Sequence, residues 1–150
     1  ELKFQVQAKI ARPRDEVFDA VYNPEKLSRY FTTGGASQPL REGALVIWKF
    51  ADYPGDIPVA VREVVPSERI VLEWAAGDHD DLKDSTNRVE MTFDGSTPDS
   101  TMVKISEGVW PDTQTGLNAS YANCQGWMNM LCCLKAWLEH GINLREGFFV

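Results

Sequence analysis

The sequence has few of the residues that cross-link a fold. Of its 150 residues, only three are cysteine, and these lie together at Cys124, Cys132 and Cys133. A disulfide framework uses an even number of cysteines spread along the chain. We therefore expect three reduced thiols and a cytoplasmic protein. Buried small residues are the favoured interpretation of these cysteines, and a redox sensor or an arsenical-type thiol site is the alternative.

Histidine is scarcer still, with two residues, and neither suits a catalytic or metal site. His79 lies in the acidic loop 77–85, which matches no known metal-binding spacing, so we favour a solvated loop. His140 falls in the last turn of an expected helix, where a cation interacts favourably with the helix dipole. We therefore expect no metal and no cofactor, and a Ser-His-Asp or Cys-His arrangement has no good candidate.

Long apolar runs and basic clusters are also missing. The longest charge-free apolar stretches, such as 45–48, have four or five residues, whereas a membrane span needs about 20. The 15 basic and 22 acidic residues give a net charge of −7, and no Lys/Arg cluster interrupts it. We therefore expect no membrane span, no secretory leader and no nucleic-acid partner.

What the sequence does contain is typical of one soluble globular domain over residues 1–150. Hydrophobic residues make up 43% of the chain, aromatic residues 11% and charged residues 25%. A chain of this length forms one ordinary domain. The five Trp, seven Phe and four Tyr are enough to build a core and to line a cavity.

The hydrophobic pattern predicts an α+β fold. Alternation over 2–11 indicates a half-buried strand. Short helices are expected near 13–22 and 24–31, the second capped by Asn23 and starting at Pro24. Further strands are expected at 44–51, 59–65, 69–76, 87–93 and 101–107, with turns at 53–56 and 94–100 and an irregular segment at 108–118. A long amphipathic helix should cover 119–140 and end at Gly141. One helix cannot cover so wide a sheet, so we expect a curved antiparallel sheet of six or seven strands with a space beside the helix.

Several segments resemble the family named after the activator of Hsp90 ATPase. They are residues 12–20 and 23–27, residues 64–70 with Trp74, and Gly126-Trp127 followed by leucines at 131, 134 and 138. The resemblance spans nearly the whole chain and implies the helix-grip fold of the Bet v 1/START-like (SRPBCC) superfamily. Proteins of that superfamily enclose a hydrophobic cavity between a curved antiparallel sheet and the C-terminal helix. They bind lipids, sterols, polyketides or plant hormones, and some are aromatases or cyclases.

The aromatic residues are the main candidates for a ligand site, although simple core packing explains them equally well. Trp74, Phe93 and Trp127 come from different elements that the implied fold brings together, and we expect them to line an apolar pocket with Trp110 and Glu107 near its mouth. The full set of expected ligand-binding residues is Trp48, Phe50, Leu72, Trp74, Met91, Phe93, Glu107, Trp110, Trp127 and Leu131.

Glu107 is the main candidate for acid–base chemistry. It follows Val103 and Ile105 at the strand period, so it should point to the interior. A buried carboxylate is costly unless it is paired or faces a cavity. It would then orient a ligand hydroxyl or act as a general base, although a position at the wet rim is the simpler interpretation. Glu63 raises the same question on its own strand.

Three functions remain open at this stage, and no catalytic residue is assigned. The first is a carrier, monomeric or homodimeric, of a hydrophobic small molecule of lipid, polyketide or aromatic type. The second is a cyclase, dehydratase or hydrolase that uses the same cavity. The third is an Hsp90-type co-chaperone or interaction module. The eukaryotic activator carries a separate N-terminal chaperone-binding domain, whereas this sequence starts at the strand of the second module. We therefore expect no strong stimulation of Hsp90 ATPase by this chain alone.

Overall fold

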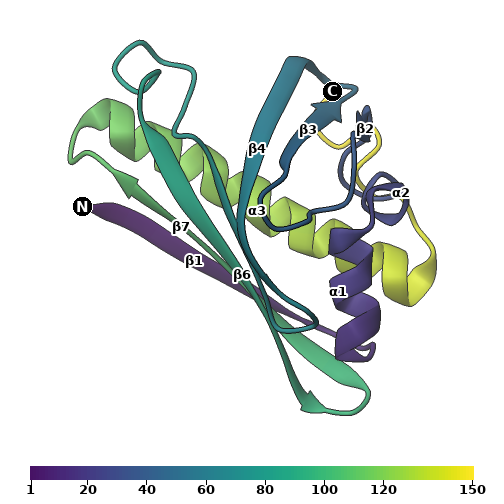
Figure 1. The fold of residues 1–150 in the computed structure, drawn as a ribbon. Helices are drawn as coiled ribbons and strands as arrows, with labels where there is room; N and C mark the ends of the chain where they lie inside the picture. The colour runs from purple at the N-terminus through teal and green to yellow at the C-terminus, as the bar shows by residue number, and fades with distance from the viewer.

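A computed structural model describes residues 1–150 and shows one antiparallel sheet with a long helix lying along it (Figure 1). None of its helices has the length and apolar character needed to cross a membrane. The elements follow the order β1 (Leu2–Ile10), α1 (Arg14–Tyr22), α2 (Pro24–Leu27), β2 (Gly35–Ala36), β3 (Leu45–Phe50), β4 (Tyr53–Val65), β5 (Arg69–Ala75), β6 (Thr86–Thr97), β7 (Ser100–Trp110) and α3 (Gln114–His140).

The sheet confirms the predicted architecture. Its seven strands pair in the order β1-β7-β6-β5-β4-β3-β2, and every neighbouring pair is antiparallel. Strand β1 alternates between more and less buried residues, as its sequence pattern indicates. Figure 1 shows α3 running across one face of the sheet, with α1 and α2 at one end of it. This is the α+β helix-grip arrangement.

Local capping signals determine where the helices begin and end. The side chain of Asn23 accepts a hydrogen bond from the backbone N–H of Glu25 at 3.0 Å, and Pro24 occupies the first turn of α2. Gly141 ends α3 in the left-handed conformation with φ 68°, which glycine adopts without the steric penalty of a Cβ atom. Both sequence predictions are confirmed at these positions.

Two predicted turns are wrong because strand pairing overrides local turn preference, and one short strand was missed. Residues 53–56 belong to β4 and are not a turn, since Tyr53 pairs with Phe50 across a tight connection. The predicted 94–100 turn is shorter, because β6 and β7 stay paired out to Thr97 and Ser100. Strand β2 was not predicted at all, because two residues carry too little periodicity.

The segment 108–118, predicted to be irregular, is instead shared between a strand and a helix. Strand β7 continues to Trp110, and α3 starts at Gln114 after Thr113, whose side chain accepts from the Gly116 N–H at 3.0 Å. Gly116 lies in the first turn of α3, where a Cβ atom would lie 2.1 Å from the Pro111 carbonyl oxygen. Glycine is therefore required at this position for close backbone approach.

The backbone of α3 does not lie equally close to all strands. It makes its close approach to β1 and β7, whereas β3, β4 and β5 lie farther from it. One apolar core of 25 buried residues spans the space between the sheet and the three helices. Between α3 and the more distant strands β3–β5, long aromatic side chains fill much of the space. The candidate site lies among them.

Candidate ligand-binding pocket

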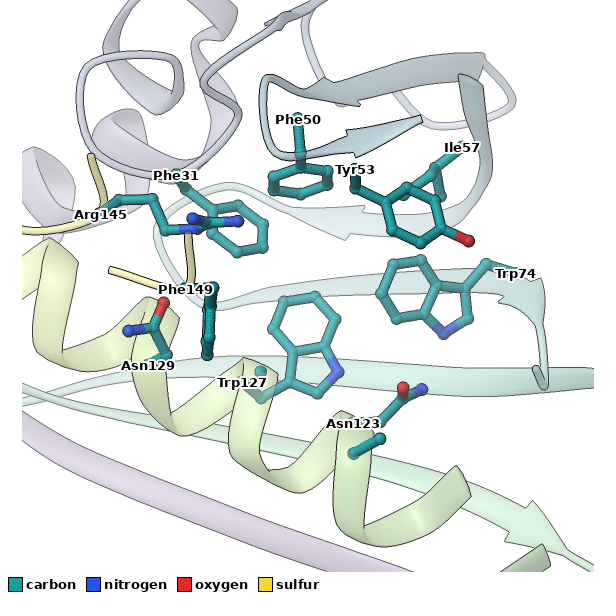
Figure 2. A pocket seen from close by; sticks show the side chains of 12 residues that line it. Phe31, Phe50, Tyr53, Ile57, Trp74, Asn123, Trp127, Asn129, Arg145 and Phe149 are labelled. Atoms are coloured by element: carbon teal, nitrogen blue, oxygen red, sulfur yellow. The ribbon is translucent and has the colours of Figure 1, made fainter. Parts of the chain in front are cut away.

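A pocket of about 200 Å³ lies between β3–β5, α3 and residues 141–150, which we call the C-terminal tail. Figure 2 shows side chains from all of these segments around one space. Eight of its twelve lining residues are hydrophobic. The lining consists of Phe31, Phe50, Tyr53, Ile57, Trp74, Ala122, Asn123, Gly126, Trp127, Asn129, Arg145 and Phe149.

The pocket continues into a wider groove of about 540 Å³, which we call the outer groove. The two spaces share Trp74, Gly126 and Phe149, among other residues. The outer groove adds polar side chains, including Asp56, Asp78 and Gln125. The site is therefore apolar on the inside and polar where it meets solvent, the common arrangement for small-molecule sites.

Packed aromatic rings form the inner wall. The rings of Trp74 and Trp127 have centroids 5.2 Å apart, and Phe31 stacks on Trp127 at 5.9 Å. Behind them, Trp48 meets both indoles edge-on, with centroids at 6.1 and 6.3 Å. Such offset and edge-to-face contacts are the favoured geometries of aromatic pairs. The wall is therefore preformed by packing within the protein.

Glu107 holds this wall in place from behind. Its carboxylate is 2% exposed and accepts hydrogen bonds from four side chains. The indole N–H groups of Trp127 and Trp74 donate at 2.8 and 3.0 Å, and the amides of Asn123 and Asn87 donate at 2.9 and 3.1 Å. These donors come from β5, β6 and α3, so one carboxylate ties two strands to the helix.

The structure corrects the predicted position of Glu107. Its side chain points inward, as the strand period indicates, but it lies beneath the pocket wall and not at a wet rim. It is absent from the pocket lining, and its oxygens are occupied by indole and amide N–H groups. Because the indole N–H groups point to Glu107, the pocket meets the carbon surfaces of the two tryptophan rings.

The C-terminal tail closes one end of the pocket through a partly buried ion pair. Arg145 donates to both carboxylate oxygens of Asp52 at 2.6 and 2.8 Å, and its guanidinium lies over the rings of Phe149 and Phe50 at 4.9 and 5.5 Å. These hydrogen bonds hold the pKa of the Asp52 carboxyl below its ordinary value of 3.8. The sequence analysis missed this pair, since two residues 93 positions apart share no local pattern.

A row of small residues on α3 leaves the space open. Ala122 and Gly126 follow each other at helical spacing and both line the pocket. A Cβ atom built on Gly126 would have no heavy atom within 4 Å. The sequence analysis used Gly126 only as part of a family motif. Its position inside an amphipathic helix, where glycine is unfavourable, was the available signal.

Nine of the ten predicted site residues divide into three groups, and Trp110 lies outside all of them. Phe50, Trp74 and Trp127 line the pocket. Trp48 lies directly behind the wall, and Glu107 fixes it. Four residues belong to the closed core instead: Leu72, Met91, Phe93 and Leu131.

Two positions need explicit correction. Phe93 does not reach the pocket, because it packs edge-to-face on Phe18 at 5.3 Å, at the end of the sheet where α1 contacts β6. Trp110 lies away from the mouth of the pocket, because β7 continues past its predicted end. It forms a second small cluster with Ala76 and Leu82, and its indole donates to the Ala76 carbonyl at 2.8 Å.

The remaining candidate groups lie outside the pocket. Glu63 pairs with Arg69 on its own part of the sheet. His79 is exposed in its loop, and the structure contains no group of three His, Cys, Asp or Glu side chains placed to hold a metal ion. Cys132 is exposed, while burial raises the pKa of the Cys133 thiol to about 11.

A seven-stranded antiparallel sheet that grips a long C-terminal helix, with a pocket between them, defines the helix-grip class. Within this class, the chain belongs to the family described as "Activator of Hsp90 ATPase homolog 1-like protein", whose profile matches residues 11–139. No curated protein matches the chain in sequence.

Several solved structures share the fold. Protein SSP2350 of Staphylococcus saprophyticus is 22% identical with TM-score 0.79, covering 96% of both chains. The Aha1 dimer of Colwellia psychrerythraea is 15% identical with TM-score 0.74, covering 94% of this chain and 98% of that one. DynU16, from the dynemicin biosynthetic locus, is 21% identical with TM-score 0.77, covering 95% of this chain and 49% of its own. At these identities the likeness shows the fold alone.

Proposed function

We propose that this protein binds a small, flat, apolar molecule in the pocket between β3–β5 and α3. The observation that carries the proposal is the preformed aromatic wall. Hydrogen bonds to Glu107 fix its two tryptophan rings, and Gly126 leaves space beside them. An apolar cavity of roughly 150 Å³ is enough to take up benzene. The inner pocket of about 200 Å³ therefore suits one aromatic ring, and the outer groove accepts its substituents.

The polar groups of the pocket favour binding over acid–base catalysis. No carboxylate, histidine or cysteine lines the inner space. Asn123 and Arg145 already donate to Glu107 and Asp52. A general base must reach the proton that it abstracts, and Glu107 is separated from the pocket by the residues that it holds. A carrier or sensor of a small molecule is therefore the function that the site supports best.

Filling the space beside Gly126 tests the proposal. We would titrate the protein with ethylbenzene and naphthalene and follow tryptophan fluorescence, since Trp74 and Trp127 lie in the wall. Binding should also raise the midpoint of thermal unfolding, because a ligand stabilises the folded state by mass action. The Gly126→Leu variant places a side chain in the pocket and should weaken binding at least tenfold without loss of stability.

Two further variants make the comparison specific. Gly126→Ala adds one methyl group at the same position and should weaken binding less than Gly126→Leu does. Cys132→Leu adds a leucine to an exposed position of α3 outside the lining and should bind like wild type. The proposal fails if wild type takes up neither ligand, or if Gly126→Leu binds as tightly as wild type.

A further inference from the structure

We infer that the ligand carries a neutral hydrogen-bond donor on its ring, such as a phenolic hydroxyl group, and that the side-chain oxygen of Asn123 accepts it. This inference rests on the proposed function and specifies the class of molecule. Asn123 lines both the inner pocket and the outer groove. It therefore lies where a ring in the inner pocket would meet the polar part of the site.

The hydrogen bonds to Glu107 fix the orientation of the Asn123 amide. Its Nδ2 donates to both carboxylate oxygens of Glu107, at 2.9 and 3.2 Å. A carboxylate only accepts hydrogen bonds, so the amide has to present its nitrogen to Glu107 and not its oxygen. The oxygen, Oδ1, is therefore turned away from Glu107, which lies beneath the pocket wall.

The Oδ1 atom of Asn123 is both accessible and without a partner. It accepts no hydrogen bond within the protein, and the side-chain atoms that are unpartnered and fully buried, which include Nδ2 of Asn129, do not include it. Figure 2 shows the Asn123 amide beside the rings of Trp127 and Trp74, whose indoles donate to the same carboxylate. An acceptor at this place can take a hydrogen bond from a ligand without any rearrangement of the wall.

The charged groups around Asn123 also favour a donor over a ligand carboxylate. The Tyr53 hydroxyl lines both spaces and donates to Asp78 at 2.5 Å. Two carboxylates, those of Asp56 and Asp78, line the outer groove, whereas no Lys, Arg or His does. The one cation of the inner lining, Arg145, is paired with Asp52. An anionic group at Asn123 would thus meet charges of its own sign.

The two parts of the site set where the donor lies on the ligand. An aromatic ring against the carbon surfaces of Trp74 and Trp127 would fill the inner pocket, and its donor would lie at the junction with the outer groove, where Asn123 is. A phenolic hydroxyl group has a pKa of about 10 and keeps its proton at neutral pH. A simple alkylphenol is the smallest molecule with these features.

The test compares three probe molecules on wild type and on Asn123→Leu, which removes the acceptor and keeps a side chain of similar size. 4-Ethylphenol differs from ethylbenzene in one hydroxyl group, and 4-ethylanisole has the same oxygen with its donor replaced by a methyl group. We expect the 4-ethylphenol-to-ethylbenzene affinity ratio to fall about fivefold in Asn123→Leu, the effect of one hydrogen bond. The 4-ethylanisole-to-ethylbenzene ratio should stay the same.

Asn87→Leu is the matched control. Asn87 also donates its amide to Glu107, at 3.1 Å, but it lines neither the inner pocket nor the outer groove. Both variants therefore remove one hydrogen bond that supports the wall, and only Asn123→Leu also removes an acceptor from the pocket. Asn87→Leu should keep the wild-type 4-ethylphenol-to-ethylbenzene ratio, even where the two affinities fall together.

Each outcome has a distinct meaning. If wild type binds none of the three probes, the proposed function fails. If the probes bind but Asn123→Leu keeps the wild-type ratio, or Asn87→Leu lowers it equally, the pocket stands and the role of Asn123 is overturned. If the 4-ethylanisole ratio falls as much as the 4-ethylphenol ratio, the donor class is overturned. Should Asn123→Leu not fold, the ¹³C signal of the Asn123 side-chain carbonyl in wild type decides, since 4-ethylphenol must shift it more than 4-ethylanisole does.

Discussion

The two sides of α3 show how one helix forms a closed core and an open pocket. On one side, the stripe that includes Met130, Leu131 and Leu134 is fully buried, and the helix backbone approaches β1 and β7. On the other side, Ala122 and Gly126 face the distant strands β3–β5 across the pocket. Side-chain volume therefore decides the difference, because a small residue opposite a distant strand leaves space that a leucine would fill.

Glu107 lies where these two sides meet. It is buried like a core residue, but its hydrogen bonds end on residues of the pocket wall, Trp74, Asn123 and Trp127. A buried carboxylate is tolerable only when its oxygens are satisfied, so the network and the wall depend on each other. The contrast between the closed side and the open side is tested below by substitutions at six positions and by one pH titration, in order of expected effect.

Replacing Glu107 should have the largest effect. Glu107→Leu removes the acceptor of four donors, of which Asn87 and Trp127 are buried, and each unsatisfied buried group costs about 1–3 kcal/mol. We expect a loss of about 4 kcal/mol in the free energy of unfolding, together with loss of ligand binding. Glu107→Gln keeps one acceptor oxygen and should lose about half as much. Urea denaturation measures both. A Glu107→Leu protein as stable as wild type would contradict a stabilising role for the hydrogen bonds to Glu107.

Truncating the pocket wall should come next. Trp127→Ala should cost about 3–5 kcal/mol and enlarge the pocket, whereas Leu134→Ala on the closed side should cost about 2–5 kcal/mol and create only an internal cavity. The two variants should therefore lose similar stability but differ in ligand uptake. Thermal unfolding with and without naphthalene distinguishes them. Equal stabilisation of both variants by naphthalene would contradict the idea that ligand uptake is confined to the open side.

Releasing the tail should have a smaller, local effect. Arg145→Ala removes the ion pair with Asp52 and both ring contacts, so amide hydrogen exchange should accelerate in residues 142–150 while the core stays protected. Global stability should fall by roughly 1–2 kcal/mol at most. Glu139→Gln, on the closed side, removes the charge that pairs with Lys135 and should leave the tail unchanged.

The same ion pair predicts an acid dependence. Since Arg145 lowers the pKa of folded Asp52 below 3.8, its contribution is complete above the unfolded pKa and is lost as the pH falls through the lowered folded value. NMR shifts of the tail amides should therefore change only below about pH 4 in wild type. The change should be absent in Arg145→Ala. A tail transition near neutral pH would contradict this linkage.

The smallest effect should come from Gly126→Ala. Alanine is favoured over glycine inside a helix by about 1 kcal/mol, and the added Cβ meets no atom within 4 Å. We expect a gain of up to about 1 kcal/mol in the free energy of unfolding. Urea denaturation measures it. A loss of stability would show that the space beside Gly126 is not open.

The sequence by itself determined the elements and the fold class. Alternation over β1, the three-to-four spacing of α3, and the capping signals at Asn23 and Gly141 are local patterns that one segment carries alone. The strand period also placed Glu107 toward the interior. The family resemblance then gave the helix-grip arrangement, which the seven-stranded sheet and the matched profile confirm.

The tertiary structure alone decided which inward-facing residues meet. Phe93 and Trp127 have similar patterns, yet one packs on α1 and the other lines the pocket. The four donors to Glu107, and the Arg145–Asp52 pair, join segments far apart in the chain. Periodicity shows which face of a strand or helix is buried, but not which neighbour it will meet. That neighbour depends on strand register and on where α3 crosses the sheet, so the pocket appears only in three dimensions.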